Sequence, residues 1–441
     1  MKKNVLTILG VVVGVIGFFA LIFMPREKLK EMNIPFVNIG TGEESKGEMK
    51  YISNVLPSDY KNGYFYIKDN EERENVMYFD YDSKKEVYVC NKPNCKHDSE
   101  SCSSYSDFTE ANELFYYNDA LYFLNSSASG ESISITADGV VTDTTGSPST
   151  IYKMNLDGTE KEKLFDSPSG TKLSMPFVLK GNVLYGYLEK SKVEEGSGHT
   201  FTTTVTERKL VSVNLSTGKY EELSDGLHAS LIGTYKDKLV IEEIDYIKDP
   251  NSFGDNTNAF RDNLYNSKMK IKLFDVATKK EEILFEEVFK NIEDMQFYKN
   301  GIYFIGEKSK NLEFFDFDTK KKEVIKELPQ SNMQLGTIID DKVLVYAYKD
   351  RDAHIGSSYY IDLKNKEMKE FSLKDKNEYL VEILASNDDY YFVKAESIFG
   401  DVYTTWAGTQ QQDIIGTNYA LIKKADYWAS ESNYIKMTNA K

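Results

Sequence analysis

The chain has 441 residues and a formal net charge of −16 at pH 7. Binding to nucleic acid requires a basic surface that offsets phosphate charge, so the acidic balance argues against that class of partner and is ordinary for a solvated surface. The 31 Tyr and 25 Phe residues, against only 2 Trp and 9 Pro, favour pleated, half-buried strands over helices.

The N-terminus carries a candidate membrane segment. A short basic tail, residues 1–4, precedes twenty uncharged residues from Val5 to Met24. As a helix rising about 1.5 Å per residue, this run spans roughly 30 Å, the thickness of the hydrocarbon core of a bilayer. The residues that follow lack the small-residue cleavage site of a secretory signal peptide. We therefore expect one transmembrane signal-anchor helix at residues 5–24, a cytoplasmic tail at 1–4 and a stalk or linker at 25–49.

The charges around this segment do not decide its orientation by the positive-inside rule. Basic residues flank both of its ends: Lys2, Lys3, Arg26, Lys28 and Lys30. A short basic tail followed by a long apolar run is the usual form of an export signal-anchor. The sequence therefore predicts a single-pass protein of the cell membrane whose remaining residues lie outside the cytoplasm.

The rest of the chain repeats one strand pattern seven times. In each copy an aromatic or aliphatic strand is followed by a tight Asn, Asp or Gly turn and a second apolar strand. The second strands begin at a spacing of 41 to 63 residues, near Tyr64, Leu121, Leu184, Leu239, Ile302, Val343 and Tyr390. Repeats of about 40–50 residues with four strands each are typical of propeller blades, and longer spacings indicate loop insertions.

A second signal recurs in six of the copies. An apolar strand ends in Asp or Asn, and a turn and a charged strand follow it, at Asp80, Asn155, Asn214, Asp275, Asp316 and Asp362. Such a side chain can accept the backbone N–H two residues further on and close a turn between strands. A generic meander or two sandwiches would share the strands but not this register.

We therefore predict an all-β, seven-bladed β-propeller over residues 50–441, behind the transmembrane helix. Each blade should run strand A, turn, strand B, loop, strand C, Asx turn, strand D. The fourth and fifth blades should lie near Leu231–Phe285 and Met295–Leu328. The seventh copy is degenerate, which suits the position where the ring closes, and the early strand Lys50–Ile52 is the candidate for closing it.

All three cysteines and one of the four histidines lie within thirteen residues, in the pattern C-x4-C-x-H-x4-C. Cys90, Cys95, His97 and Cys102 make a complete tetrahedral ligand set for a structural zinc, although the spacing is not that of a standard zinc finger. The alternative is a disulfide among the cysteines, which would leave one spare thiol. The loop connects strand D of the first blade to strand A of the second, so we expect it on the same face as the B–C loops.

A family resemblance becomes visible at this loop. The run Cys-Asn-Lys-Pro-Asn-Cys-Lys-His-Asp at residues 90–98, after a first-blade strand and behind an N-terminal anchor, resembles uncharacterised membrane-anchored propellers of Gram-positive bacteria. These belong to a domain of unknown function named for its similarity to the YWTD propeller of the low-density lipoprotein receptor. The resemblance implies a six- or seven-bladed extracytoplasmic propeller without a known activity. The YWTD tetrapeptide itself is absent from this chain, so receptor-like ligand binding is not implied.

The longest connections of the predicted propeller fall between strands B and C, and these loops emerge on one face. They are residues 125–149, 190–207, 246–268 and 396–418. Long loops gathered on one face favour a binding surface, or are simply tolerated insertions. Tyr403 and Trp406, followed by Gln410 to Gln412, suit stacking on a carbohydrate or peptide. Asp350, Asp352 and His354 could bind a metal, but the sequence favours a solvated loop there.

Motifs of catalysis are absent from the sequence. It has no GxSxG elbow, no HExxH and no P-loop, although its 70 acidic residues leave room for the facing carboxylates of a glycosidase. The sequence therefore favours a non-enzymatic extracytoplasmic binding propeller, tethered to the membrane, with a protein, peptide or carbohydrate ligand on its loop-rich face. The alternatives are a glycoside-active propeller enzyme and an envelope-assembly scaffold.

Overall fold

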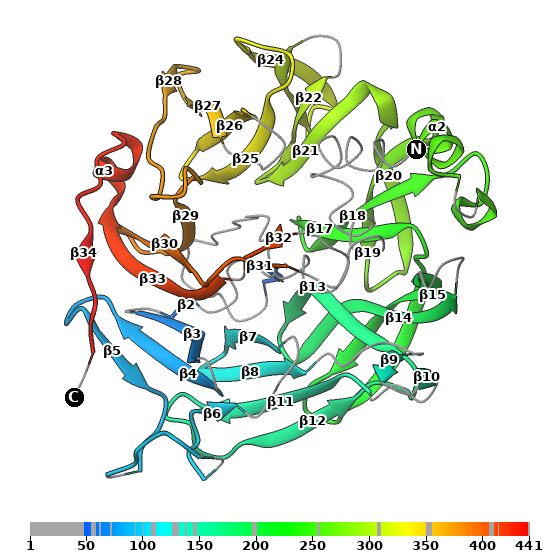
Figure 1. The fold of residues 1–441 in the computed structure, drawn as a ribbon. Helices are drawn as coiled ribbons and strands as arrows, with labels where there is room; N and C mark the ends of the chain where they lie inside the picture. The colour runs from blue at the N-terminus through cyan, green and yellow to red at the C-terminus, as the bar shows by residue number, and fades with distance from the viewer. Residues whose placement is uncertain are drawn as a thin grey trace.

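The computed structural model of the chain describes residues 48–53, 59–60, 63–70, 73–92, 94–99, 101–106, 112–125, 132–136, 139–143, 148–195, 201–253, 256–306, 310–349, 355–404, 410–412 and 414–439. In these residues, seven sheets of four or more strands stand side by side around a ring (Figure 1). The predicted seven-bladed all-β propeller is therefore confirmed. Among the described residues no helix is long and apolar enough to cross a membrane, and the predicted anchor at residues 5–24 lies outside them.

Each blade runs from an innermost strand A to an outermost strand D, with antiparallel neighbours. The first three blades are β2 (Asp59–Tyr60), β3 (Gly63–Asn70), β4 (Arg73–Asp80) and β5 (Lys85–Tyr88); β7 (Asn112–Tyr117), β8 (Ala120–Asn125), β11 (Thr150–Asn155) and β12 (Glu162–Asp166); and β13 (Lys172–Lys180), β14 (Val183–Glu195), β15 (Phe201–Asn214) and β16 (Lys219–Asp225).

The remaining four blades follow the same order. They are β17 (Ala229–Tyr235), β18 (Lys238–Asp245), β19 (Lys268–Asp275) and β20 (Lys280–Val288); β21 (Ile292–Tyr298), β22 (Gly301–Gly306), β23 (Asn311–Asp316) and β24 (Lys321–Glu327); β25 (Gln334–Ile339), β26 (Lys342–Tyr348), β27 (Ile355–Asp362) and β28 (Met368–Glu370); and β29 (Glu382–Ser386), β30 (Tyr390–Phe399), β33 (Ile414–Lys423) and β34 (Ile435–Lys436). The fourth and fifth blades thus begin and end within three residues of the predicted bounds.

The Asx turns between strands C and D form as predicted. In the fourth blade, Asp275 Oδ1 accepts the backbone N–H groups of Ala277 and Thr278, both at 3.0 Å. Lys279 then donates its own N–H to the Asp275 carbonyl at 2.8 Å and adopts a φ of 54°. Equivalent side-chain bonds form at Asp80, Asn214, Asp316 and Asp362. The second blade differs, because there Asp157 rather than Asn155 accepts the N–H of Thr159.

A repeated β-bulge that the sequence did not predict shapes the outer strands. In four blades the register between strands C and D skips one residue at the same place, at Leu164, Leu223, Leu284 and Ile325. Each of these side chains belongs to an apolar cluster between two blades. A bulge adds one residue to a strand and bends it. The outer strand can therefore point this one side chain into the interface between two blades, which we call a seam, although many of its other residues are charged.

The apolar core therefore lies between the blades. At the seam where the last blade meets the first, the ring of Phe392 packs against Tyr64 and Phe79, with centroids 4.9 and 5.3 Å apart. Phe392 and Phe79 are fully buried in this cluster, which also includes Trp428. Facing sheets bury their side chains against each other in this way around the whole ring.

The ring closes differently from the expectation. The last blade has its own outer strand, β34, and the chain then crosses to the first blade, where β35 (Thr438–Asn439) pairs in parallel with β5. The early strand β1 (Lys50–Ile52) does not close the ring, because it pairs antiparallel with β13 as an extra innermost strand of the third blade.

The B–C insertions occur where they were predicted, but all four contain regular structure. The second-blade insertion contains the paired strands β9 (Ser132–Thr136) and β10 (Gly139–Asp143), and the last-blade insertion contains the paired strands β31 (Tyr403–Thr404) and β32 (Gln410–Gln411). In the third blade, residues 190–195 and 201–207 extend the pairing of β14 with β15 as far as Glu195 and Phe201. The insertion of the fourth blade contains a helix that was not expected, α2 (Thr257–Asn266). Its sequence signals were the N-cap Asn256, whose side chain accepts the N–H of Ala259 at 3.1 Å, and the i,i+4 apolar pair Phe260 and Leu264.

Candidate metal centre

The Cys/His loop is an excursion between two strands that both pair with β4. Outer strand β5 ends at Tyr88, and the chain returns as β6 (Tyr105–Ser106), which pairs with Glu74 and Asn75 of β4. Two residues of β4 also bond to the loop. The side chain of Asn75 donates to the backbone oxygen of His97 at 3.3 Å, and the backbone N–H of Val76 donates to the backbone oxygen of Ser104 at 2.7 Å. The ladder of the first blade thus holds both ends of the loop.

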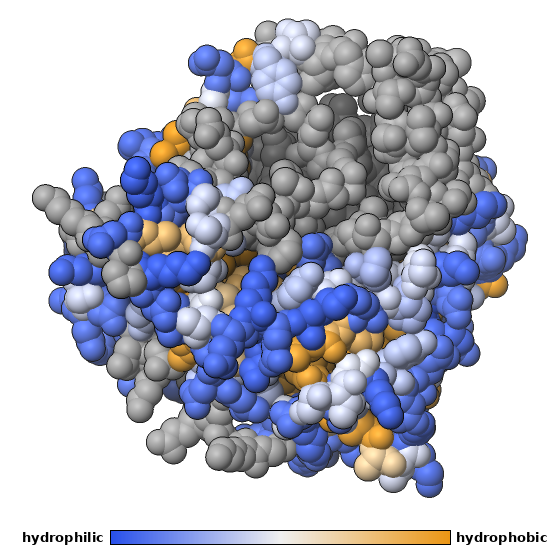
Figure 2. All heavy atoms as spheres, turned by 90° about the horizontal axis from the view of Figure 1, so that it is seen from below, coloured by the Kyte–Doolittle hydropathy of each residue, from blue (hydrophilic) through white to orange (hydrophobic). Residues whose placement is uncertain are grey.

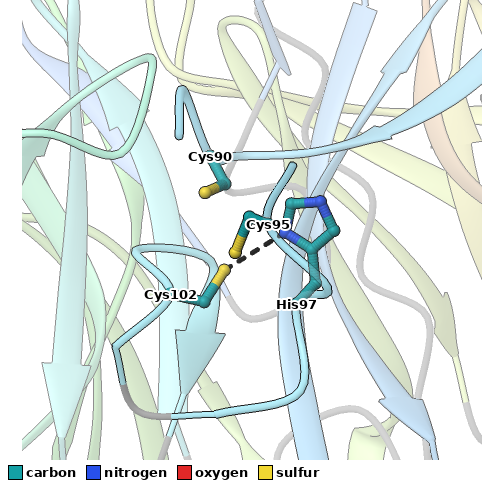
Figure 3. A group of neighbouring side chains, drawn as sticks. All are labelled: Cys90, Cys95, His97 and Cys102. Atoms are coloured by element: carbon teal, nitrogen blue, oxygen red, sulfur yellow. Dashed lines mark hydrogen bonds between the residues drawn. The ribbon is translucent and has the colours of Figure 1, made fainter. Parts of the chain in front are cut away.

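The four predicted ligands converge. The sulfur atoms of Cys90, Cys95 and Cys102 and a ring nitrogen of His97 all lie within 4.8 Å of one another (Figure 3). His97 Nδ1 lies 3.2 Å from Cys102 Sγ, and the three cysteines are not bonded to one another. In a tetrahedral zinc site, sulfur atoms about 2.3 Å from the metal are about 3.8 Å apart. The cluster could therefore hold a metal ion after a small closure of the side chains.

Backbone and ring contacts fix the orientation of the histidine. The ring of His97 stacks on Tyr88, with centroids 4.1 Å apart and planes 9° from parallel. Asn94, between the first and second cysteines, and His97, between the second and third, both have a φ of 58°, a left-handed conformation that changes the direction of the chain. These turns let residues spaced by five and two positions point at one centre.

The environment favours the metal-binding protonation state at Cys90 and His97, but not at Cys102. Burial alone would raise the pKa of the Cys90 thiol, but the backbone N–H of Lys92, the hydroxyl of Ser103 and the two neighbouring thiols lower it to about 7. Burial lowers the pKa of His97, which keeps the imidazole neutral. Burial raises the pKa of Cys102, so this thiol is the one that most needs a cation beside it to ionise.

The loop lies at the outer edge of the seam between the first and second blades. Asn91 Nδ2 donates to Asp157 Oδ2 at 3.1 Å, in the C–D turn of the second blade. At Gly158 of the same turn, a Cβ would lie only 2.4 Å from the oxygen of Val89 and 2.6 Å from the hydroxyl of Ser103. The D-to-A connectivity is as predicted. The contact of the loop with a C–D turn at the outer edge was not expected.

The predicted ligand-binding residues are only partly placed. Tyr403 lies in the insertion of the last blade, on β31 (Tyr403–Thr404), which pairs with β32 (Gln410–Gln411). This small hairpin projects over the centre of the ring in Figure 1. Tyr403 is 41% exposed, and Ile398 and Val402 of the same insertion are 40% and 56% exposed. Trp406 lies outside the described residues, as do Asp350, Asp352 and His354.

Three carboxylates on inner strands were not singled out from the sequence. Burial raises the pKa of Glu242 on β18 to about 8. Burial also raises the pKa of Glu113 on β7 and of Glu382 on β29 to about 7, although Lys172 and Lys394 partly offset it. The three belong to different blades, the second, the fourth and the last.

No known family model matches the sequence, and no curated protein is significantly similar to it. Solved structures of similar fold include a puromycin-hydrolyzing peptidase of Mycobacterium tuberculosis, with 9% identity and a TM-score of 0.48, over 90% of this chain and 54% of that one. An oligogalacturonate lyase in complex with manganese has 11% identity and a TM-score of 0.47, over 86% of this chain and 92% of that one.

The β-propeller domain of the Trilobed protease from Pyrococcus furiosus has 14% identity and a TM-score of 0.42, over 83% of this chain and 99% of that domain. The chain spans about half the length of the peptidase. At this level of identity, the similarity extends to the fold and not to the activities of these proteins. The resemblance to membrane-anchored propellers of Gram-positive bacteria has no family match behind it and stays a prediction.

Proposed function

We propose that this chain is a non-enzymatic binding propeller, held outside the cytoplasm by a membrane helix at residues 5–24, whose ligand is a protein, peptide or carbohydrate. One observation carries the proposal. The insertion of the last blade carries three exposed apolar side chains within six residues: Ile398 near the end of β30, and Val402 and Tyr403 at the start of a small hairpin that lies over the centre of the ring (Figure 1). Exposed apolar side chains that gather on a loop face, rather than lying singly, are typical of a binding surface.

The rest of the described surface supports this assignment by contrast. The side view in Figure 2 is dominated by hydrophilic side chains along the outer edge, with apolar atoms showing between them. On the outer strands, apolar side chains such as Tyr220, Ile283 and Val324 are exposed one per blade. Isolated exposures of this kind are normal for a soluble surface and need no partner.

A matched pair of variants tests the proposal. Purified full-length protein in nanodiscs is applied to arrays of oligosaccharides and peptides, and bound signals are compared with those of Tyr403→Ala and Tyr220→Ala. The two tyrosines are equally exposed, at 41%, so loss of area alone cannot distinguish them. We expect Tyr403→Ala to lose at least tenfold in affinity for any bound probe and Tyr220→Ala to lose nothing. Equal effects of the two substitutions, or turnover of a bound oligosaccharide, would overturn a non-enzymatic loop-face role.

A binding signal that appears only with other envelope proteins would instead favour the envelope-assembly scaffold.

We propose that the Cys/His cluster holds a structural zinc ion. Cys90, Cys95, His97 and Cys102 would bind it, and the ion would supply no catalysis because four protein ligands leave no open position. It would neutralise the thiolates of a loop that has little apolar surface of its own. Metal analysis of the purified protein should find one zinc per chain, and Cys95→Ser should lose it. A metal-free protein with one disulfide and one alkylatable thiol would establish the alternative.

The location can be tested separately. We expect protease added to intact cells to remove the domain from about residue 50 onward. Digestion that requires cell lysis would place the propeller inside and leave the binding proposal without its extracytoplasmic setting.

A further inference from the structure

Strand β1 occupies an unusual place for the first strand of a propeller. It adds to the inner edge of the third blade, where Lys50 pairs with Leu179 and Ile52 with Phe177 of β13. In Figure 1 it is the short blue strand beside β13, at the centre of the ring. The chain therefore joins the propeller at its axis and not at its rim.

The direction of this strand identifies the face at which the chain enters. Strand β13 runs from the loop-rich face, where the D–A connection delivers it, to the A–B turn at Gly181 and Asn182. Because β1 is antiparallel to β13 and Lys50 lies beside Leu179, one residue before the end of β13, the start of β1 is next to that turn. The chain before Lys50 thus leaves the ring on the face of the short A–B and C–D turns, opposite the B–C insertions.

The packing around β1 makes this attachment specific. Ile52 is buried in the cluster between the second and third blades. The next side chain, Tyr51, points to the other side, packs in the cluster between the third and fourth blades, and donates its hydroxyl to the carbonyl of Leu231 at 3.3 Å. Successive side chains of a strand point to opposite faces, so two adjacent residues engage both neighbouring seams. A one-residue slip would exchange their environments, which fixes the register.

We infer that the short-turn face of the propeller is turned toward the membrane and the loop-rich face away from it. This inference rests on the proposed membrane tether. A tether attached at the centre of one face, rather than at the rim, keeps that face nearest to the bilayer however the propeller rotates about its own axis. The exposed side chains of Val402 and Tyr403 therefore face outward, toward ligands that are soluble or carried on another surface, and not toward lipid headgroups of the same membrane.

Distances from the membrane test the inference. In full-length protein reconstituted into lipid vesicles, a fluorophore is attached to azidophenylalanine placed at Asn182, in an A–B turn, or at Val402, on the loop-rich face. Both side chains are exposed, and neither belongs to the metal cluster. A quencher is carried on the lipid headgroups. We expect at least threefold stronger quenching at position 182 than at position 402. Equal quenching, or stronger quenching at position 402, would overturn the inference.

A second measurement does not depend on the membrane. Spin labels in detergent-solubilised full-length protein should give a shorter distance for the pair Glu48 and Asn182 than for the pair Glu48 and Val402. The reverse order would overturn the assignment of the entry face. If the protein fails to float with vesicles while this order is found, the membrane tether is wrong but the entry face stands.

Discussion

Different contacts join the blades in two regions of the ring. One region comprises the seams between the third and sixth blades, and the other comprises the two seams on either side of the first blade. In the regular region, a Lys at the fifth position of each Asx turn pairs with a Glu on the outer strand of the preceding blade. The pairs are Lys279–Glu221 at 2.6 Å, Lys320–Glu282 at 3.0 Å and Lys366–Glu323 at 3.1 Å. All six side chains are well exposed, so each pair contributes only about 0–1 kcal/mol.

The first blade does not share this arrangement. Its equivalent residue, Lys84, lies over the ring of Tyr390 in the last blade, 4.6 Å from the centroid. Strand β35 adds to its outer strand, and the Cys/His loop joins it to the second blade. Regular blades thus need only local turns and apolar packing. The blade where the ends of the ring meet is joined by contacts between distant parts of the chain.

The largest expected effect comes from the metal. A chelator should lower the free energy of unfolding by several kcal/mol, since structural zinc can contribute about 10 kcal/mol or more to folding. Hydrogen exchange should accelerate in residues 89–106 and stay unchanged in residues 280–327. Cys95→Ser should behave like chelated protein and be insensitive to the chelator. If the chelator changed hydrogen exchange equally in both regions, or in neither, a metal ion that stabilises only this loop would be contradicted.

Apolar packing should matter equally in both regions. Phe392→Ala at the closing seam should cost about 3–5 kcal/mol by denaturant unfolding, because it leaves a cavity among buried rings. Phe285→Ala is the matched change in the regular region, where Phe285 packs on Phe315 with centroids 4.9 Å apart. We expect a cost of similar size. If Phe285→Ala cost less than about 1 kcal/mol, the regular seams would depend on something other than their apolar core.

A buried carboxylate gives the regular region a pH dependence. Burial raises the pKa of Glu242 to about 8. Burial also raises the pKa of the nearby Tyr51 of β1, and Glu242 adds to that shift. Between its ordinary value of about 4.5 and about 8, the folded protein keeps a proton that the unfolded chain releases. Stability should therefore fall as pH rises through this window, with a slope of up to about 1.4 kcal/mol per pH unit.

The substitution Glu242→Gln should remove this component and make the protein more stable than the parent at pH 8 but not at pH 5. Thermal unfolding at the two pH values measures the difference. An unchanged pH profile would show that Glu242 ionises normally in the folded protein.

The smallest effect should come from the Lys–Glu pairs. Lys320→Gln should change the free energy of unfolding by about 1 kcal/mol or less, and 0.5 M salt should abolish the difference. The double variant with Glu282→Gln measures the coupling directly. A loss of more than about 2 kcal/mol would mean that ion pairs, and not apolar packing, hold the regular blades together.

The number and the bounds of the blades could be predicted because their signals are local. An Asx residue such as Asp275 or Asp316 bonds to the backbone two and three residues away, so a short stretch of sequence determines the turn. The approach of Cys90, Cys95, His97 and Cys102 was predictable for the same reason, since thirteen residues contain them all.

The features that the sequence did not reveal depend on contacts between distant residues. Nothing near Lys50–Ile52 indicates that this strand pairs with β13, some 125 residues later in the chain. The partner of β35 and the position of Asn91 against Asp157 are equally non-local. The bulges at Leu284 and Ile325 were missed because an alternating pattern does not show which residue is skipped.

The central claim is that a metal ion stabilises the Cys/His loop beside the first blade, where the Lys–Glu pairs of the regular blades do not occur. X-ray absorption at the zinc edge of the purified full-length protein tests it most directly. We predict one zinc per chain with three sulfur ligands at about 2.3 Å and one nitrogen at about 2.0 Å. Protein without stoichiometric metal, in which two of the three cysteines form a disulfide, would contradict the account.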